Sequence, residues 1–291
     1  MSELRYEAPK TLAEAVALLS GAKGRARVLA GGTDLLIQMR TGRIQPELLV
    51  DIKAVPELSE IVAGNGGYRI GAAVTGMQLI EHADFAKRWP GVVDGVRLIG
   101  SLQVKGRATV GGNLCNASPA ADSVPALIAA GAIARIVGPH GAREAAVETV
   151  VVGPGKTSLA VGEIVTSLLL PPRPLRSGDA YLRFTPRSEM DIAVVGAGVN
   201  LTLDAQGICT QARVALGAVA SRALLVPEAA AALIGTKVDA AVLARLAAAA
   251  RDACSPIDDK RGSREFRIRT AGVMVCRAAG IALDRARRND G

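Results

Sequence analysis

The chain has 291 residues, of which 49% are hydrophobic and 21% are charged, so it is long enough for roughly two or three domains and can bury a substantial core. Aromatic residues make up only 2% of it, which leaves neither stacking platforms for nucleic-acid bases nor an aromatic membrane belt. The formal net charge of +8 comes from spread-out basic residues that are interleaved with carboxylates near the C-terminus. This pattern favours a solvated helix face or a subunit contact over nucleic acid.

The cysteines and the N-terminus bear on the compartment and on metal binding. The four cysteines form no C-x-x-C or C-x-x-H pair, which predicts free thiols and neither a zinc site nor an iron–sulfur cluster in this chain. The first residues lack the charged and apolar blocks of a signal peptide, and no run of about 18 apolar residues occurs. We therefore expect a cytoplasmic protein with no membrane span.

Short helices and strands alternate in the first part of the chain. Thr11 and Glu14 have the spacing of a capping box, and apolar residues follow at helical spacing until Gly21. Thr75 can likewise cap a helix that runs to about His82. The other elements expected here are strands over 27–30, 48–52 and 68–74, a turn over 55–57, and helices over 35–39 and 92–99.

The pattern of predicted elements changes at a linker predicted over 171–178, a segment that contains prolines, a glycine and charged residues. Before the linker, Asp122 or Ser123 can cap a helix that Gly131 ends. Alanine-rich helices are expected from Pro227 to the end. The predicted strands are 133–138, 143–147 and 163–170 before the linker, and 181–186, 192–203 and 212–219, as an antiparallel sheet, after it.

Two glycine pairs, Gly31-Gly32 and Gly111-Gly112, each follow an apolar run that reads as a strand. Paired glycines let a backbone turn tightly and bring its N–H groups close to an anion, because no Cβ stands in the way. A single Gly-Gly pair is a weak signal, since most such pairs are structural. Side chains after the second pair can bond ribose or ribityl hydroxyls, namely Asn113, Asn116, Ser118 and Asp122. Together the two motifs predict loops that converge on an extended, polyhydroxylated dinucleotide.

Commoner nucleotide and catalytic motifs fail on spacing. The run 196–201 lacks the third glycine of the Rossmann fingerprint, and Gly155-Lys156-Thr157 lacks the first glycine of a Walker loop, which would fall at Val150. His82 and His140 have no paired serine or cysteine motif. No catalytic residue and no metal ligand is therefore assigned.

Three runs carry a resemblance to a known family: Ala30-Gly31-Gly32-Thr33-Asp34-Leu35-Leu36, Arg107-Ala108-Thr109-Val110-Gly111-Gly112-Asn113, and Ala117-Ser118-Pro119-Ala120-Ala121-Asp122. The chain resembles, over essentially its whole length, the medium, FAD-binding subunit of molybdenum hydroxylases, the group of carbon monoxide dehydrogenase and bacterial xanthine and nicotine dehydrogenases. The second run is the most specific. The resemblance implies an α+β chain with a vanillyl-alcohol-oxidase (PCMH)-type FAD-binding fold over 1–177, in subdomains of about 1–55 and 56–177. A C-terminal antiparallel sheet with packed helices, 178–291, would follow.

The resemblance also implies which residues hold FAD. The two glycine motifs would wrap its pyrophosphate, and Asp122 would contact its sugar-like portion. Ile99, Val165 and Arg183 would border the cofactor, with Arg183 at a position where relatives can have lysine. The residues implied to bind FAD are Val28, Leu29, Ala30, Gly31, Gly32, Thr33, Asp34, Leu35, Ile99, Thr109, Val110, Gly111, Gly112, Asn113, Ala117, Ser118, Asp122, Val165 and Arg183.

In this family the hydroxylation takes place in another polypeptide. The resemblance implies that electrons from a molybdenum cofactor in a large subunit pass through iron–sulfur clusters in a small subunit to this FAD, and then to an external acceptor. The expected assembly is a dimer of heterotrimers, a heterohexamer. Two alternatives stay open: a stand-alone FAD-dependent oxidase of the same fold, and a scaffold subunit that has lost FAD.

Overall fold

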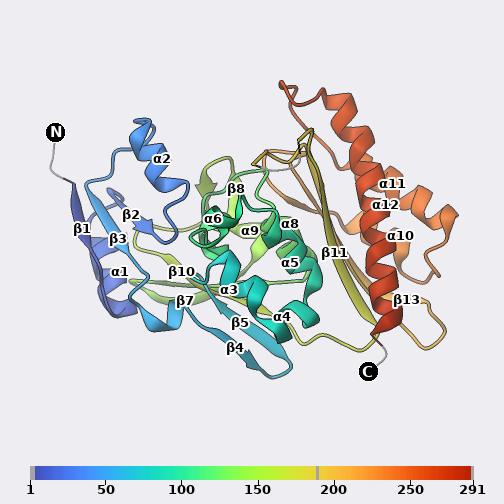
Figure 1. Cartoon of the computed structure of the whole chain (residues 1–291), viewed down its shortest axis with the longest axis horizontal. Helices are drawn as coiled ribbons and strands as arrows, with labels where there is room; N and C mark the ends of the chain where they lie inside the picture. Colours follow the sequence, from blue (N-terminus) through green and yellow to red (C-terminus); the bar gives the residue numbers. More distant parts are fainter. Residues whose placement is uncertain (1–3, 188–189, 290–291) are drawn as a thin grey trace.

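The computed structural model describes residues 4–187 and 190–289, which form a series of β-sheets with helices packed around them (Figure 1). The first sheet is parallel, with the order β1-β3-β2. Parallel neighbours need crossover connections, and α1 (Leu12–Gly21) and α2 (Leu35–Arg40) lie in these two connections. The three strands are β1 (Arg5–Glu7), β2 (Ala26–Leu29) and β3 (Leu48–Asp51).

The start of α1 follows its sequence signal in part. Thr11 Oγ1 accepts a hydrogen bond from the Glu14 backbone N–H at 3.2 Å, as predicted. The Glu14 carboxylate, however, accepts from the Lys10 N–H at 3.0 Å rather than from Thr11. Strand β1 was not predicted, because its three residues carry no alternation long enough to be recognised.

The second sheet is antiparallel throughout, in the order β4-β5-β10-β6-β7. Its central strand, β10, matches the strand predicted over 163–170 and is almost wholly buried. Outside this sheet, β8 (Val151–Gly153) and β9 (Lys156–Thr157) form a separate small hairpin. The strands of the large sheet are β4 (Ile61–Gly64), β5 (Gly67–Gly71), β6 (Ile133–Gly138), β7 (Gly141–Ala146) and β10 (Ile164–Leu170).

Short helices lie between the strands, and most of them share one hydrophobic core with the second sheet, around Phe85 and Trp89, whereas Leu58 of η1 belongs to the core of the first sheet. The capping box predicted at Thr75 is present in both halves, with Gln78 as its partner. The helices are η1 (Pro56–Leu58, 3-10), α3 (Gly76–Glu81), α4 (Ala83–Arg88), α5 (Pro90–Arg97), α6 (Leu102–Lys105), α7 (Val110–Cys115), α8 (Ser123–Ala129) and α9 (Val147–Val150).

The C-terminal part is an antiparallel sheet in the order β11-β12-β13-β14. Helix α12 packs along one face, and α5 and α8 pack on the other (Figure 1). A second large core joins the sheet to its C-terminal helices. The elements are β11 (Ser177–Phe184), β12 (Val195–Leu203), β13 (Cys209–Gly217), β14 (Leu224–Leu225), α10 (Pro227–Leu233), α11 (Ala240–Asp252) and α12 (Arg264–Arg288).

The end of the predicted linker is a correction. Residues Ser177 and Gly178 were assigned to the linker, but they are buried and begin β11. A Cβ on Gly178 would collide with the backbone carbonyl of Ala282 in α12. The glycine is therefore there for close packing of a helix on a strand, not for chain flexibility.

No helix within 4–187 and 190–289 has the length and hydropathy needed to cross a membrane. In the same residues, no cluster of three or more histidine, cysteine, aspartate or glutamate side chains could hold a metal ion.

Candidate functional site

A cavity of about 930 Å³, counting the part open to solvent, lies where the first sheet meets the helices of the second. Its wall includes both glycine pairs, so the structure brings the two motifs together as the sequence predicted. The predicted site residues that line it are Val28, Ala30, Gly31, Gly32, Thr33, Asp34, Leu35, Ile99, Thr109, Gly111, Gly112, Asn113 and Val165. The predicted site residues outside its lining are Leu29, Val110, Ala117, Ser118, Asp122 and Arg183.

The first glycine motif presents a run of unpaired amides. The backbone N–H groups of residues 31–35 have no acceptor in the described part of the chain, although all five residues line the cavity. Gly32 has φ +77°, a left-handed conformation that favours glycine. The chain then enters α2, where the Leu36 N–H donates to the Gly32 carbonyl at 3.1 Å. Consecutive free N–H groups around such a turn form a concavity suited to an anion.

The two motifs touch directly. A Cβ on Gly31 would collide with the carbonyl of Arg107, the second residue before Thr109. Only glycine lets the first loop lie this close to the backbone that leads into the second motif. The backbone of Ala108 is held in turn by the Gly76 N–H, which donates to its carbonyl at 2.9 Å.

The second glycine motif differs from the loop that the sequence predicted. It forms α7, which Thr109 caps by accepting from the Gly112 N–H at 3.0 Å. The Val110 and Gly111 N–H groups donate to the carbonyls of Val74 and Ala72, each at 3.2 Å. The expected free amides are thus used internally. A Cβ on Gly111 would lie 2.6 Å from Ala72, so this glycine serves close packing of α7 against the end of β5.

Polar side chains still face the cavity from α2 and α7. Asn113 Oδ1 accepts from Ser123 Oγ at 2.7 Å, and its amide nitrogen donates to no described residue. The Gln38 Nε2 donates to Asn116 Oδ1 at 2.9 Å, which ties α2 to α7 across the cavity wall. Gln38 was not among the predicted site residues. Its place one turn after Asp34 on a helix that starts at the glycine loop is the signal that could have found it.

Asp122 and Arg183 form a buried ion pair behind the cavity wall. Asp122 Oδ2 lies 2.6 Å from Arg183 Nη1, and the two side chains are 8% and 6% exposed. The Tyr181 hydroxyl donates to Asp122 Oδ1 at 2.9 Å. Arg183 also donates to the Leu98 carbonyl at 2.9 Å, next to the cavity-lining Ile99. The pair therefore supports the wall from β11 rather than forming it.

Burial decides the protonation behaviour of this cluster. Desolvation raises the pKa of the Asp122 carboxyl to about 6, and the attraction of Arg183 and the hydrogen bond from Tyr181 only partly oppose it. Burial, with the neighbouring Asp122 charge, raises the pKa of Tyr181 well above its usual value of 10. Asp122 is thus the one member of this cluster that can titrate near neutral pH.

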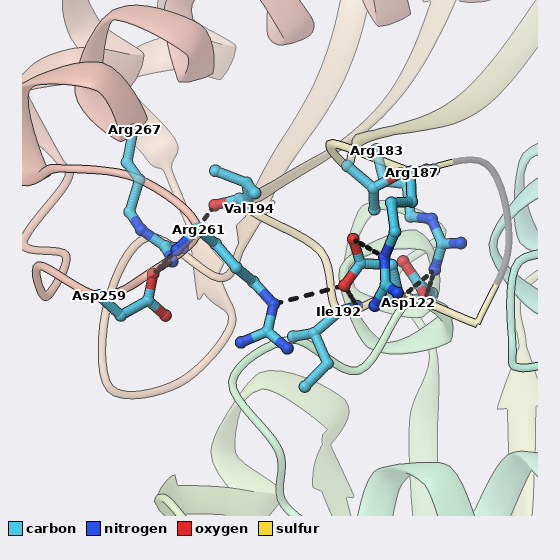
Figure 2. Close-up of polar contacts among 10 residues, drawn as sticks. Asp122, Arg183, Arg187, Ile192, Val194, Asp259, Arg261 and Arg267 are labelled. Carbon is cyan, nitrogen blue, oxygen red and sulfur yellow. Dashed lines mark hydrogen bonds and ion pairs between the residues drawn. The ribbon is translucent and has the colours of Figure 1, made fainter.

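Ion pairs and hydrogen bonds continue from this cluster towards the start of α12 (Figure 2). The Arg183 guanidinium also donates to the Asp191 carbonyl at 3.3 Å. The Asp191 carboxylate accepts from Arg261 at 3.4 Å. Arg267, buried on α12, pairs with Asp259 at 2.8 Å and donates to the Val194 carbonyl at 2.8 Å. These contacts fix the end of β11 and the start of β12 against the C-terminal helix.

Two family models match this chain, and together they cover most of its length. Residues 2–173 match the family described as FAD binding domain in molybdopterin dehydrogenase, and residues 180–282 match the CO dehydrogenase flavoprotein C-terminal domain. The carbon monoxide dehydrogenase medium chain of Afipia carboxidovorans is 35% identical over 97% of both chains. A putative xanthine dehydrogenase FAD-binding subunit of Escherichia coli is 31% identical over 96% of this chain and 95% of its own.

Solved structures give the same result and confirm the expected fold. A chain of the cyanide-inactivated Cu,Mo-CO dehydrogenase superposes with a TM-score of 0.94 at 35% identity, covering 97% of this chain and 98% of its own. A chain of quinoline 2-oxidoreductase from Pseudomonas putida 86 superposes with a TM-score of 0.88 at 29% identity, covering 99% and 98%. With its cavity walled by the two glycine motifs, the chain belongs to the FAD-binding medium subunits of the molybdenum-containing hydroxylases.

Proposed function

We propose that this chain carries electrons from partner subunits through FAD to an external acceptor, with FAD held in the cavity between the two glycine motifs. The observation that carries the proposal is the run of unpaired amides at 31–35, which lie on the cavity wall and have no protein acceptor in the described residues. A pyrophosphate supplies the negative charge and the acceptor atoms that such a concavity lacks.

The remaining wall suits the other parts of the cofactor. The amide nitrogen of Asn113 can donate to a hydroxyl of the sugar-like portion. Apolar side chains, among them Val28, Ile99 and Val165, offer surfaces for flat rings. When bound, FAD supplies hydride and single-electron chemistry, whereas the protein contributes position and electrostatics. The thiol of Cys115 also lines the cavity, but burial raises its pKa to about 12, so it stays protonated.

The cavity favours electron transfer over a stand-alone oxidase. Its described lining holds three titratable side chains: Asp34, Cys115 and Glu163. Glu163 is engaged by Arg143, whose Nη2 lies 2.7 Å from it and lowers the pKa of that carboxyl. Neither histidine nor tyrosine is present in this lining to take a proton from a substrate. The free amides argue in turn against a scaffold that has lost its cofactor.

The partners remain part of the proposal. We infer a small iron–sulfur subunit and a large molybdenum subunit, assembled as a dimer of heterotrimers in the cytoplasm. We also infer that the FAD-binding part spans 1–177 and the C-terminal part 178–291. The relatives support the existence of partner subunits, because the chains matched over nearly their whole length are named a medium chain of carbon monoxide dehydrogenase and an FAD-binding subunit of xanthine dehydrogenase.

A charge placed among the free amides tests the cofactor site. Thr33→Asp puts a carboxylate where the pyrophosphate is expected, so the Kd for FAD should rise at least about tenfold. Thr41→Asp adds the same charge at the exposed end of α2, outside the cavity, and should leave FAD binding unchanged. Titration of deflavinated protein followed by flavin fluorescence measures both. Equal affinity in the two variants, or a wild-type chain that binds no FAD, contradicts the assignment.

The electron-transfer role needs the complex. Addition of the hydroxylation substrate to the purified complex, without an acceptor, should bleach the flavin absorption of this chain. The FAD-loaded chain alone should keep its spectrum in the same solution. If the isolated chain is reduced as fast as the complex, the stand-alone oxidase is the better description.

A further inference from the structure

An apolar groove crosses the outer surface of the C-terminal part, between the end of β11 and helix α12. Its open volume is about 1180 Å³, and its floor is formed by Phe184, Phe266, Val273 and Met274. On α12 the lining residues fall at 266, 269, 270, 273, 274 and 277, which is one helical face. The opposite face of the helix is buried against the sheet. The groove therefore belongs to the solvent side of the C-terminal helix.

The composition of this surface is unusual for the chain. The sequence contains only three phenylalanines, and two of them, Phe184 and Phe266, line the groove. Their rings meet edge to face with centroids 5.6 Å apart. Phe266 is 42% exposed and Val273 is 47% exposed. Exposed aromatic anchors in a shallow hollow are typical of the centres of protein–protein interfaces.

Three arginines border the groove, and their charges are not balanced by a carboxylate of the described residues. The lining contains Arg251, Arg269 and Arg277 but no carboxylate, and none of the three forms an ion pair in the part of the chain that the structure describes. Arg267 and Arg285, on the same helix, are by contrast paired with aspartates.

A glycine leaves room for Arg251. A Cβ on Gly272 would lie 2.5 Å from Arg251 Nε, so the glycine lets the Arg251 side chain of α11 lie across α12 as it does here. The Arg251 side chain reaches the lining of the groove in this way. A positive rim around an apolar floor is complementary to a ligand that has an apolar anchor flanked by carboxylates.

We infer that this groove docks a polypeptide segment of a partner subunit, with an aromatic or aliphatic anchor between aspartate or glutamate residues. The anchor packs on Phe184, Phe266 and Val273, and the carboxylates pair with the arginines of the rim. This inference rests on the proposed function, because it requires that partner subunits exist. It assigns to these partner subunits a binding surface in the C-terminal part, whereas the glycine motifs of the cofactor site lie in the N-terminal part.

Charge reversal tests the inference in the complex. In the double variant Arg269→Glu/Arg277→Glu, like charges face the incoming segment, and the affinity for partner subunits should fall at least about tenfold. The matched control is Lys237→Glu/Arg245→Glu, which reverses two exposed charges outside the groove. Tagged chains are purified with their partners, and the molybdenum, iron and FAD per chain are measured at several salt concentrations. The groove variant should lose molybdenum or iron and keep its FAD, while the control keeps all three.

A photo-crosslinker at the centre of the groove identifies the occupant. With p-benzoylphenylalanine in place of Val273, irradiation of the wild-type complex should join this position to an acidic segment of a partner subunit, as located by mass spectrometry. A crosslink to a second copy of this chain, or to no polypeptide, overturns the inference, as does full retention of partners by the charge-reversed variant. If the wild-type chain itself purifies without molybdenum- or iron-containing partners, the proposed function fails instead.

Discussion

The buried carboxyl of Asp122 should titrate near neutral pH, and its replacement by asparagine tests why. In the folded chain, burial raises its pKa from 3.8 to about 6 in spite of the Arg183 guanidinium at 2.6 Å. Below pH 3.8 the carboxyl is protonated in the folded and unfolded states alike. Between pH 3.8 and about 6 the unfolded chain loses this proton while the folded chain keeps it, so the stability that the raised pKa contributes at low pH is lost as the pH rises through the folded pKa.

The size of this loss follows from the two pKa values. A rise from 3.8 to about 6 corresponds to about 3 kcal/mol in the free energy of unfolding, of which about 2 kcal/mol is lost between pH 4 and pH 7. Asp122→Asn abolishes this dependence. It also leaves Arg183 without its counter-ion, which costs about 3–5 kcal/mol, but that cost does not vary with pH because arginine stays charged in this range.

Urea unfolding at half-unit steps from pH 4 to pH 7 measures the difference. The wild-type free energy of unfolding, minus that of Asp122→Asn, should decrease by about 2 kcal/mol across this range. Every other titratable side chain is present in both proteins, so its contribution cancels in the difference. The pKa of Tyr181 is too high to contribute. A difference that stays constant with pH, or that grows as the pH rises, would show that attraction to Arg183 outweighs desolvation and would refute the reasoning.

Two further substitutions probe other contacts. Burial raises the pKa of Asp51, but hydrogen bonds from Lys53 and Tyr6 outweigh it and hold the pKa below its usual value, so the wild type should lose stability relative to Asp51→Asn as the pH falls below about 4. A pH-independent difference in urea unfolding would contradict this. Gly178→Ala should destabilise the chain by about 1–3 kcal/mol, because its Cβ meets the Ala282 carbonyl, whereas Gly280→Ala, with nothing within 4 Å, should not. Equal melting temperatures of the two variants would count against close packing there.

Elements with local signals could be predicted from the sequence. The capping box at Thr75 and the apolar run of β10 need only neighbouring residues to form, and both are present in the structure. Elements defined by distant contacts could not. Strand β1 is three residues long and exists because it pairs with β3 more than 40 residues later. Gly178 was predicted to lie in a linker. The contact that requires a glycine there, the close approach of α12, comes from residues about 100 positions later in the sequence.

The candidate site, too, could be predicted only in part. Both glycine motifs were placed on one cavity, and most of the residues assigned to it line the wall. Asp122 and Arg183 were assigned to the same site, but they meet each other behind the wall, with Tyr181 as a third partner. Such a cluster joins residues about 60 positions apart, and no periodicity of the sequence encodes which of them meet.

The difference between the two glycine pairs, however, can be traced to the acceptors around each. The Thr109 hydroxyl accepts the Gly112 N–H at the start of α7, and the Val110 and Gly111 N–H groups donate to the backbone carbonyls of Val74 and Ala72. Around Gly31-Gly32 no such acceptor lies among the described residues, so the amides of this loop remain free for a ligand. Paired glycines alone therefore do not predict an anion site. Whether a capping side chain and neighbouring carbonyls take their N–H groups decides between a helix start and a loop that can bind an anion.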